Sequence, residues 1–270
     1  EEADNALRAN IIMLHGLLRL MAGDMSPTEE ADMDIALINT YAKKGITNDP
    51  LTHLAQPPVM ADLFNEVLSM AGTGQGLAAR LRRFTEGTFS GIFSQQSNVQ
   101  LNNRFVVFNI RDLEDELRPI GMYIVLNYIW NRVKTDRRKR ILVVDEAWQL
   151  MQYQDSAMFL FSIAKRARKY FLGLTTISQD VEDFLSTRLG RAIVNNSSLQ
   201  LLLKQNPAAV DIVADTFKLT SEESSRLSQF PVGEGLFFAG LSHIILRILA
   251  SPMETQLIST NPQHMLDQQR

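Results

Sequence analysis

The sequence predicts an α/β fold, with a mostly parallel sheet and helices on both of its faces, to which an all-α subdomain is attached. In roughly the first hundred residues, apolar side chains recur about every 3.6 residues, and no segment alternates convincingly with a period of two. From about residue 100, short apolar runs alternate with helical segments, which is typical of right-handed crossovers between parallel strands. We therefore expect an all-α subdomain over residues 1–100 and an α/β core over residues 101–270.

The all-α part is predicted to consist of helices separated by glycine or proline. Gly23 ends the first helix, whose apolar stripe begins at Leu7. Ser26 and Glu29 have the spacing of a capping box, and Pro27 between them suits the first position of the next helix. The helices are expected over residues 5–22, 27–45, 60–70 and 77–84.

The second part is predicted to alternate strands and helices. Buried strands are expected over residues 104–110, 141–144, 172–178 and 199–204, because each is a short run rich in β-branched or other apolar residues. Helices are expected over residues 116–133, 156–170 and 181–194, with two more after the caps Asn206 and Thr220. Residues 235–239 and 243–249 flank Gly240 and indicate an antiparallel hairpin at the sheet edge.

The composition excludes several classes of protein. Hydrophobic residues make up 45% and charged residues 21% of the chain, which is ordinary for a globular protein and excludes wholesale disorder. The absence of cysteine excludes disulfides, zinc–thiolate sites, iron–sulfur clusters and cysteine nucleophiles. No apolar run approaches the ~20 residues of a membrane span, and the acidic first residues are unlike a secretory signal. We expect a soluble cytoplasmic protein without a direct membrane span, and the four scattered histidines indicate no metal site.

The strongest chemical pattern is a run of four apolar residues followed by Asp145 and Glu146. In open α/β sheets, ligands bind at the carboxyl ends of the strands. Asp145 would orient Mg²⁺, usually through its waters, and Glu146 would polarise the water that attacks the γ-phosphate of ATP. This is a Walker B pattern with a catalytic glutamate. The alternative interpretation is a strand followed by the acidic first turn of a helix.

Two further features lie near this pattern in the sequence. Gln179 ends the next predicted strand and could sense the γ-phosphate or hold the attacking water, or simply cap the following helix. The intervening helix ends in the basic segment Lys165–Lys169. Such a cluster is favourable with the helix dipole, but in a ring-shaped ATPase it can also reach the phosphates of the neighbouring subunit as an arginine finger.

Several segments together resemble the conjugation and type IV secretion ATPases of the VirB-four type. They are VVDEAWQLM, RARKYFLGLTTISQDVEDF, IVNNSSLQLLLKQ and VGEGLFFAG, and the resemblance extends from about residue 35 to the end. It implies a RecA-like P-loop NTPase core with the all-α subdomain inserted in it. It also implies a homo-oligomer, a hexamer, at the cytoplasmic face of the inner membrane. There the protein would hydrolyse ATP, with other secretion components as partners, to power substrate transfer or pilus assembly.

The resemblance assigns roles to individual residues. Asp145 and Glu146 correspond to the Walker B pair, and Gln179 corresponds to the sensor glutamine. Arg168 lies eleven residues before that glutamine, which is the spacing of the finger arginine in the related coupling ATPases. Arg166 and Lys169 are the alternatives for contacting nucleotide.

The sequence departs from the family pattern in one respect. It contains no Gly-x-x-x-x-Gly-Lys-Ser/Thr motif, and the nearest approach, Gly72–Gly76, lacks the lysine and a preceding strand. The family's P-loop lies upstream of the all-α part, so the chain resembles a fragment that alone would be inactive.

Two alternatives stay open. One is a DNA-translocating coupling ATPase of the HerA/FtsK kind, and the other is a non-catalytic docking module that lacks a P-loop. The formal charge of −3 does not indicate DNA as a partner. The basic turn over residues 134–140 could touch DNA or lipid headgroups, or be a solvated turn.

Overall fold

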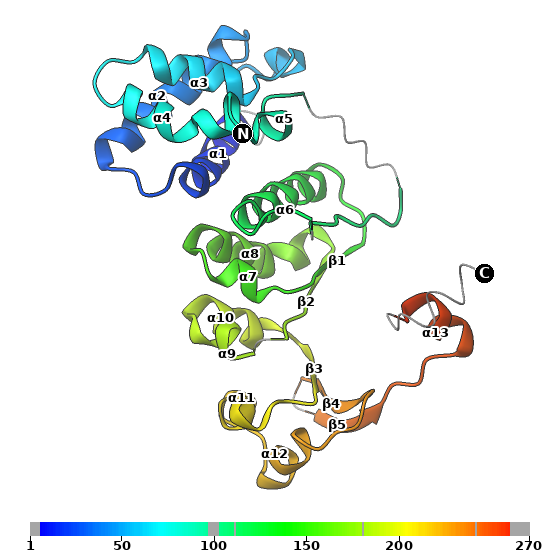
Figure 1. Cartoon of the computed structure of the whole chain (residues 1–270). Helices are drawn as coiled ribbons and strands as arrows, with labels where there is room; N and C mark the ends of the chain where they lie inside the picture. Colours follow the sequence, from blue (N-terminus) through cyan, green and yellow to red (C-terminus); the bar gives the residue numbers. More distant parts are fainter. Residues whose placement is uncertain (1–5, 97–102, 111, 180, 241, 260–270) are drawn as a thin grey trace, which may run out of the picture. The chain divides into compact units, whose positions relative to one another are not determined.

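A computed structural model describes residues 6–96, 103–110, 112–179, 181–240 and 242–259 (Figure 1). The chain divides into two compact units. The first comprises the residues up to Leu142 together with Gln152–Thr175, and the second comprises Val143–Met151 together with the residues from Thr176 onward. Among the helices of the described ranges, none has the length and apolarity needed to cross a membrane.

Over the described residues 6–96, the N-terminal part of the first unit contains helices joined by turns and no strand. Its elements are α1 (Ala6–Ala22), α2 (Pro27–Lys43), η1 (Pro50–Leu54), α3 (Met60–Ser69), α4 (Gly74–Thr85) and α5 (Ser90–Phe93). Four side chains from α1, α2 and α4 are fully buried at its centre: Leu18, Met33, Leu77 and Leu81. The helices that the sequence predicts here are therefore present.

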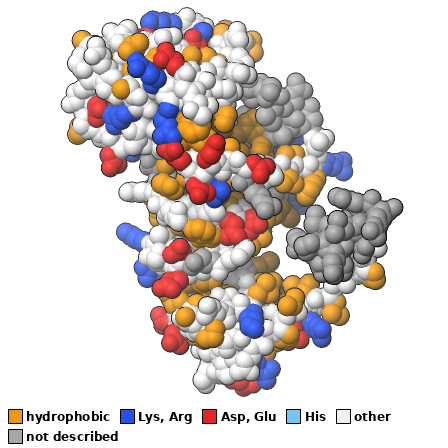
Figure 2. Space-filling model, viewed as in Figure 1, with side chains coloured by type: hydrophobic (Ala, Val, Ile, Leu, Met, Phe, Trp, Pro, Cys, Tyr) orange, Lys and Arg blue, Asp and Glu red, His pale blue; other side chains and the backbone are white. Residues whose placement is uncertain are grey.

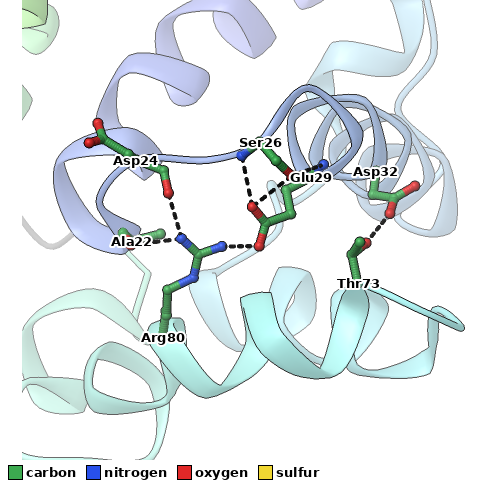
Figure 3. A network of polar contacts seen from close by, with 7 residues as sticks. All are labelled: Ala22, Asp24, Ser26, Glu29, Asp32, Thr73 and Arg80. Carbon is green, nitrogen blue, oxygen red and sulfur yellow. Dashed lines mark hydrogen bonds and ion pairs between the residues drawn. The ribbon is translucent and has the colours of Figure 1, made fainter.

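A polar network ties α4 to the turn between α1 and α2 (Figure 3). The Arg80 guanidinium donates hydrogen bonds to the carbonyl oxygens of Ala22 (3.2 Å) and Asp24 (2.8 Å), and it pairs with the Glu29 carboxylate. Glu29 also completes the predicted capping box, since it accepts a hydrogen bond from the Ser26 backbone N–H at 2.8 Å. The pKa of Glu29 lies below its usual value, mainly because of this hydrogen bond from the backbone.

The rest of the first unit adds α6 (Arg118–Thr135), α8 (Gln154–Arg166) and η2 (Ala167–Tyr170), with most of the strands β1 (Arg140–Val144) and β2 (Leu172–Thr176). Side chains of these elements form a second apolar cluster, which consists of Trp130, Val133, Ile163, Ala167 and Leu172. The Arg140 backbone N–H donates to the Phe171 carbonyl (3.1 Å), and further along both strands the Ile177 N–H donates to the Val144 carbonyl (2.9 Å). Because both strands advance in the same direction between these bonds, the pair is parallel.

The second unit contains an antiparallel sheet of order β3-β4-β5 (Leu199–Leu203, Glu234–Ala239 and Ser242–Arg247). Its helices are α7 (Trp148–Met151), α9 (Val181–Ser186), α10 (Arg188–Asn196), η3 (Pro207–Ala209), α11 (Val210–Phe217), α12 (Ser221–Leu227) and α13 (Pro252–Ile258). Leu202 pairs with Leu236 across the sheet and packs on Val213 and Leu227. The predicted hairpin is confirmed, and Gly240 supplies the positive φ of 63° that its turn requires.

The prediction of a strand over residues 104–110 is wrong. These residues form no strand, and Phe105 and Val107 are 84% and 71% exposed. A strand requires a neighbouring strand for its backbone N–H and C=O groups, and β1 and β2 pair with each other. The apolar composition of residues 104–110 therefore does not make them a strand, because no described strand lies beside them to accept and donate the backbone hydrogen bonds.

Two predicted helices also differ in detail. The helix over residues 181–194 is broken at Thr187, whose hydroxyl caps α10 by accepting from the Gly190 N–H at 2.9 Å. The helix expected to run to residue 170 tightens into η2 after Arg166 and ends where Phe171 adopts a left-handed φ of 55°. Both breaks depend on local capping geometry, to which apolar periodicity is insensitive.

The described strands form two sheets, whereas the sequence predicts one. In each sheet, described helices pack against one face. On β3, Leu202 is buried, while its neighbours Leu201 and Leu203 are exposed on the opposite face. On β1, Ile141 and Val143 are exposed in the same alternating way. Figure 2 shows hydrophobic side chains at the surface around β4 and β5. Apolar faces of both sheets are thus open within the described part of the chain.

The two compact units do not follow the predicted boundary at residue 100. Helix α6 joins the core of the helical part, where Tyr123 and Ile120 are buried, and the α8 residue Phe159 packs against Tyr123 with ring centroids 5.5 Å apart. Contacts of this kind assign α6 and α8 to the first unit. As a division into domains, the boundary at residue 100 remains a prediction.

Helices α1 and α6 approach closely at Gly16, where a Cβ atom would overlap the hydroxyl of Tyr123. That hydroxyl donates to the Met13 carbonyl at 3.0 Å. We expect Gly16→Ala to lower the free energy of unfolding of this chain by about 1–3 kcal/mol, because overpacking forces the two helices apart. Denaturant titration followed by circular dichroism measures the change.

Gly76→Ala is the matched control, because Gly76 also lies within a helix and has no atom within 4 Å of its Cβ position. It should leave stability unchanged or raise it by up to about 1 kcal/mol. Equal stability of the two variants would contradict the close approach of α1 and α6.

Candidate functional site

Asp145 and Glu146 directly follow β1, where the sequence predicts the carboxylates of the site. Asp145 is exposed, and its Oδ1 accepts a hydrogen bond from the Glu146 backbone N–H at 2.9 Å. Glu146 has a φ of 50°, a left-handed conformation that is uncommon for a residue other than glycine. The Ala147 N–H then donates to the Ile177 carbonyl at 2.9 Å. The turn is therefore fixed to the end of β2 by a backbone hydrogen bond.

The Glu146 carboxylate is held by two side-chain donors. Its Oε2 accepts a hydrogen bond from the indole Nε1 of Trp148 at 2.6 Å, and its Oε1 accepts one from the amide Nε2 of Gln179 at 2.7 Å. Glu146 and Gln179 are separated by 33 positions in the chain but lie beside each other because β1 and β2 pair. The structure thus brings two of the predicted site residues together.

These side chains line an open pocket in the second unit. Its walls are formed by Glu146, Trp148, Gln149 and Gln179. Among the described residues, the lining contains one anionic side chain and no lysine or arginine. Such a surface can orient and polarise a water molecule, but it provides no positive charge to hold the phosphates of a nucleotide.

Trp148 and Gln149 belong to the segment VVDEAWQLM, but the sequence analysis does not assign them to the site; from the sequence, Trp148 is expected to pack behind the Walker B loop. Trp148 lies two positions after Glu146. A tryptophan carries a ring N–H that usually finds a hydrogen-bond partner when the ring packs. A tryptophan so close to a strand-end carboxylate is a signal that could have identified the contact.

Asp145 is the described side chain best suited to magnesium. Mg²⁺ in nucleotide sites is bound through one or two carboxylates together with phosphate oxygens and waters. One oxygen of Asp145 is occupied by the Glu146 N–H, and the other remains available at an exposed position. The described residues contain no group of three or more metal-ligating side chains. This donor set fits an ion that shares its ligands with a nucleotide and does not form a separate metal cage.

The predicted basic residues belong to the first unit, whereas the residues that line the pocket belong to the second. Arg166 donates to the Ser162 carbonyl at 3.1 Å and its guanidinium lies 5.3 Å from the centroid of the Trp130 ring. Arg168 and Lys169 lie in η2 and are exposed. Neither has a hydrogen-bond or ion-pair partner for its side chain within the described residues. Arg166 is thus held against its own helix, whereas Arg168 is available to another molecule.

The glycine-rich segment Gly72–Gly76 comprises the end of the turn after α3 and the first residues of α4. The Thr73 hydroxyl pairs with the Asp32 carboxylate (Figure 3), and a Cβ on Gly74 would overlap the Val67 carbonyl oxygen. The segment connects α3 to α4 and follows no strand. Close packing against α3 thus explains Gly74, and a positive φ of 77° explains Gly72.

The family model of the TraG P-loop domain matches residues 76–229, which is more than half of the chain. The chain belongs to this family. The structure of VirB4 of Thermoanaerobacter pseudethanolicus matches with a TM-score of 0.85 and 32% identity, over 92% of this chain and 71% of that one. The predicted type IV secretion ATPase of the VirB4 type and the predicted RecA-like α/β fold are both confirmed.

Curated relatives share part of their length with this TraG P-loop family member. The type IV secretion system protein virB4 of Bartonella henselae is 27% identical over 219 residues, which cover 79% of this chain and 26% of that protein. The DNA import protein CedB of Sulfolobus acidocaldarius is 24% identical over 154 residues, which cover 53% of this chain and 24% of that protein. The matched regions span about a quarter of the length of these relatives.

We expect this chain alone to bind Mg-ATP weakly or not at all. The pocket lining has no cation, and Asp145 and Glu146 repel a triphosphate, since like charges a few ångströms apart interact unfavourably. Isothermal titration calorimetry should show no saturable binding at micromolar concentrations. A longer version that carries the family's P-loop is the positive control. Tight binding by the 270-residue chain would mean that an unrecognised set of backbone N–H groups holds the phosphates.

Proposed function

We propose that this chain is part of the ATPase motor of a bacterial type IV secretion or conjugation system. In the full-length protein it hydrolyses ATP to ADP and phosphate to power substrate transfer or pilus assembly. One observation carries the proposal: the Glu146 carboxylate is held at the end of β1 beside Gln179 from the end of β2. This is the position that a water-activating carboxylate and a γ-phosphate sensor require in an α/β nucleotide site.

Each residue has a distinct role in this proposal. Glu146 accepts a proton from the attacking water through a carboxylate oxygen, and Gln179 orients that water or contacts the γ-phosphate. Asp145 holds Mg²⁺, through water, by its exposed oxygen. The ion, when bound with nucleotide, neutralises charge on the phosphates. Arg168 reaches the nucleotide of a neighbouring subunit, with Arg166 and Lys169 as the alternatives.

The proposed assembly is a homo-oligomer, a hexamer, at the cytoplasmic side of the inner membrane, in contact with other type IV secretion components. The match to virB4 proteins supports this setting. An exposed arginine in η2 is consistent with a site completed by a second subunit.

DNA translocation is the second candidate function. The similarity to a DNA import protein favours it, whereas the formal charge of −3 does not. Stimulation of ATP hydrolysis by added DNA would distinguish a DNA pump from a motor that acts on secretion components. A docking module without catalysis would show no hydrolysis in the full-length protein at all.

Replacing Glu146 by glutamine in the full-length protein tests the catalytic assignment. We expect hydrolysis to fall by about 10²-fold or more, because the amide cannot take the proton of the attacking water, while nucleotide affinity stays nearly unchanged. A phosphate-release assay and a nucleotide-binding titration measure the two quantities. Glu222→Gln, at an exposed glutamate of α12, is the matched control. Hydrolysis by Glu146→Gln at the parental rate would reject the assignment.

Arg168 is tested by mixing two inactive full-length variants, Arg168→Ala and Glu146→Gln. If Arg168 acts on the nucleotide of the neighbouring subunit, mixed rings contain some sites with an intact Glu146 and an intact Arg168, and hydrolysis returns. Arg168→Lys should be nearly as damaging as Arg168→Ala, since an ammonium lacks the planar donor fork of a guanidinium.

The control for Arg168 is Arg82→Ala, which removes another exposed arginine from the last turn of a helix. It should retain parental hydrolysis. Mixed oligomers that form but stay silent would contradict action between subunits, and Arg168 would then only favour the dipole of its helix.

A further inference from the structure

Trp148 begins α7, two positions after Glu146, and its ring is partly buried at the pocket. The residues that follow it anchor this short helix, since Leu150 and Met151 are buried. The indole N–H is a donor with no acceptor function. It lies 2.6 Å from Oε2 of Glu146, slightly closer than the ~2.7–2.9 Å usual for an N–H hydrogen bond to a charged acceptor.

We propose that Trp148 is a positioning residue for Glu146: its indole N–H fixes the orientation of the carboxylate that polarises the attacking water. The inference rests on the proposed function and deepens it. It concerns a contact within the second unit, which contains both residues.

The backbone explains why a fixed donor is needed here. Glu146 adopts a φ of 50°, a conformation that costs free energy and persists where the surroundings determine it. Three hydrogen bonds hold the turn: Glu146 N–H to Asp145 Oδ1 (2.9 Å), Ala147 N–H to the Ile177 carbonyl (2.9 Å) and Gln149 N–H to the Glu146 carbonyl (3.0 Å). These bonds fix the backbone but leave the side-chain torsions of Glu146 free. Trp148 and Gln179 restrict those torsions.

The two donors differ in how firmly they are held. Gln179 is exposed and follows the end of β2, so its amide can exchange Glu146 for a water or a phosphate oxygen. Trp148 belongs to a one-turn helix whose last two residues, Leu150 and Met151, are buried. If Gln179 turns to the nucleotide, the indole still holds Oε2. Oε1, which has a second acceptor position, is then free to receive the proton of the water.

The contact itself is tested in this chain by nuclear magnetic resonance of the two indole N–H groups, Trp130 and Trp148. Trp148→Phe identifies the signal of Trp148. We expect Glu146→Ala to speed exchange of the Trp148 indole proton with solvent by about tenfold or more, because its acceptor is lost. The Trp130 signal, from a buried ring of the first unit, should stay unchanged and reports that this unit remains folded, and an unchanged circular dichroism spectrum reports the same for the whole chain.

Gln149→Ala is the matched control for that experiment, since Gln149 lines the same pocket without being the proposed acceptor. It should leave the exchange rate of the Trp148 indole within about twofold. Unchanged exchange in Glu146→Ala, or an equal acceleration in Gln149→Ala, would overturn the proposed contact whether or not the protein hydrolyses ATP.

The catalytic consequence is tested with Trp148→Phe in the full-length protein, which keeps an aromatic ring and removes the N–H. We expect kcat to fall about 10- to 100-fold, since a misplaced catalytic group costs a factor of this size, while KM for ATP stays within about twofold. Adding Trp148→Phe to Glu146→Gln should cause little further loss, because the two residues act as one unit.

The outcomes separate this inference from the proposed function. Parental hydrolysis by Glu146→Gln rejects the role of Glu146 itself. An inactive Glu146→Gln together with a fully active Trp148→Phe, or with a Trp148→Phe that changes only KM, overturns the positioning role and leaves the proposed function standing.

Discussion

The hydrogen bonds at the carboxyl ends of β1 and β2 determine the geometry of the site. The Ile177 N–H donates to the Val144 carbonyl, and its own carbonyl accepts from the Ala147 N–H, each at 2.9 Å. Together they fix the backbone on both sides of the two carboxylates. They also place Gln179, two residues beyond Ile177, where its amide reaches Glu146 at 2.7 Å. A shift of one residue in this pairing would turn the side chains of β2 to the opposite face.

The distribution of charge at the site defines what else it requires. The pocket presents a carboxylate, two amides and an indole, which are donors and acceptors suited to a water molecule. A nucleotide triphosphate needs cationic groups and backbone N–H groups as well. Because the described pocket supplies none of the cations, the proposed hydrolysis would require groups from elsewhere, either another part of the full-length protein or another subunit. This requirement follows from electrostatics and is independent of the family assignment.

The helical part of the first unit is held by contacts of a different kind. Its interior is apolar, with Leu18, Leu81 and Phe84 fully buried. At its edge, Arg80 satisfies two carbonyl oxygens near the end of α1 and the Glu29 carboxylate of the next helix. Helix termini expose unsatisfied carbonyl groups, and a guanidinium with several donors can bind more than one of them. The helices are therefore joined by polar contacts as well as by apolar burial.

The sequence by itself determined the features that depend on neighbouring residues. The capping box at Ser26, the glycine turn of the hairpin and the run of four apolar residues before Asp145 all follow from patterns a few positions long. The type and approximate bounds of most helices and strands could be predicted for the same reason. So could the proximity of Glu146 and Gln179, because strand ends in an α/β fold meet at one edge; their role as site residues stays a prediction.

The tertiary structure alone decided which groups meet. It paired Glu146 with both Trp148 and Gln179, divided the strands between two sheets, and left residues 104–110 without a strand despite their apolar sequence. Strand pairing and a hydrogen bond across 33 positions depend on which distant segment offers a partner. A local pattern carries no information about that partner, because backbone groups and carboxylates bind whatever donor the fold brings within reach.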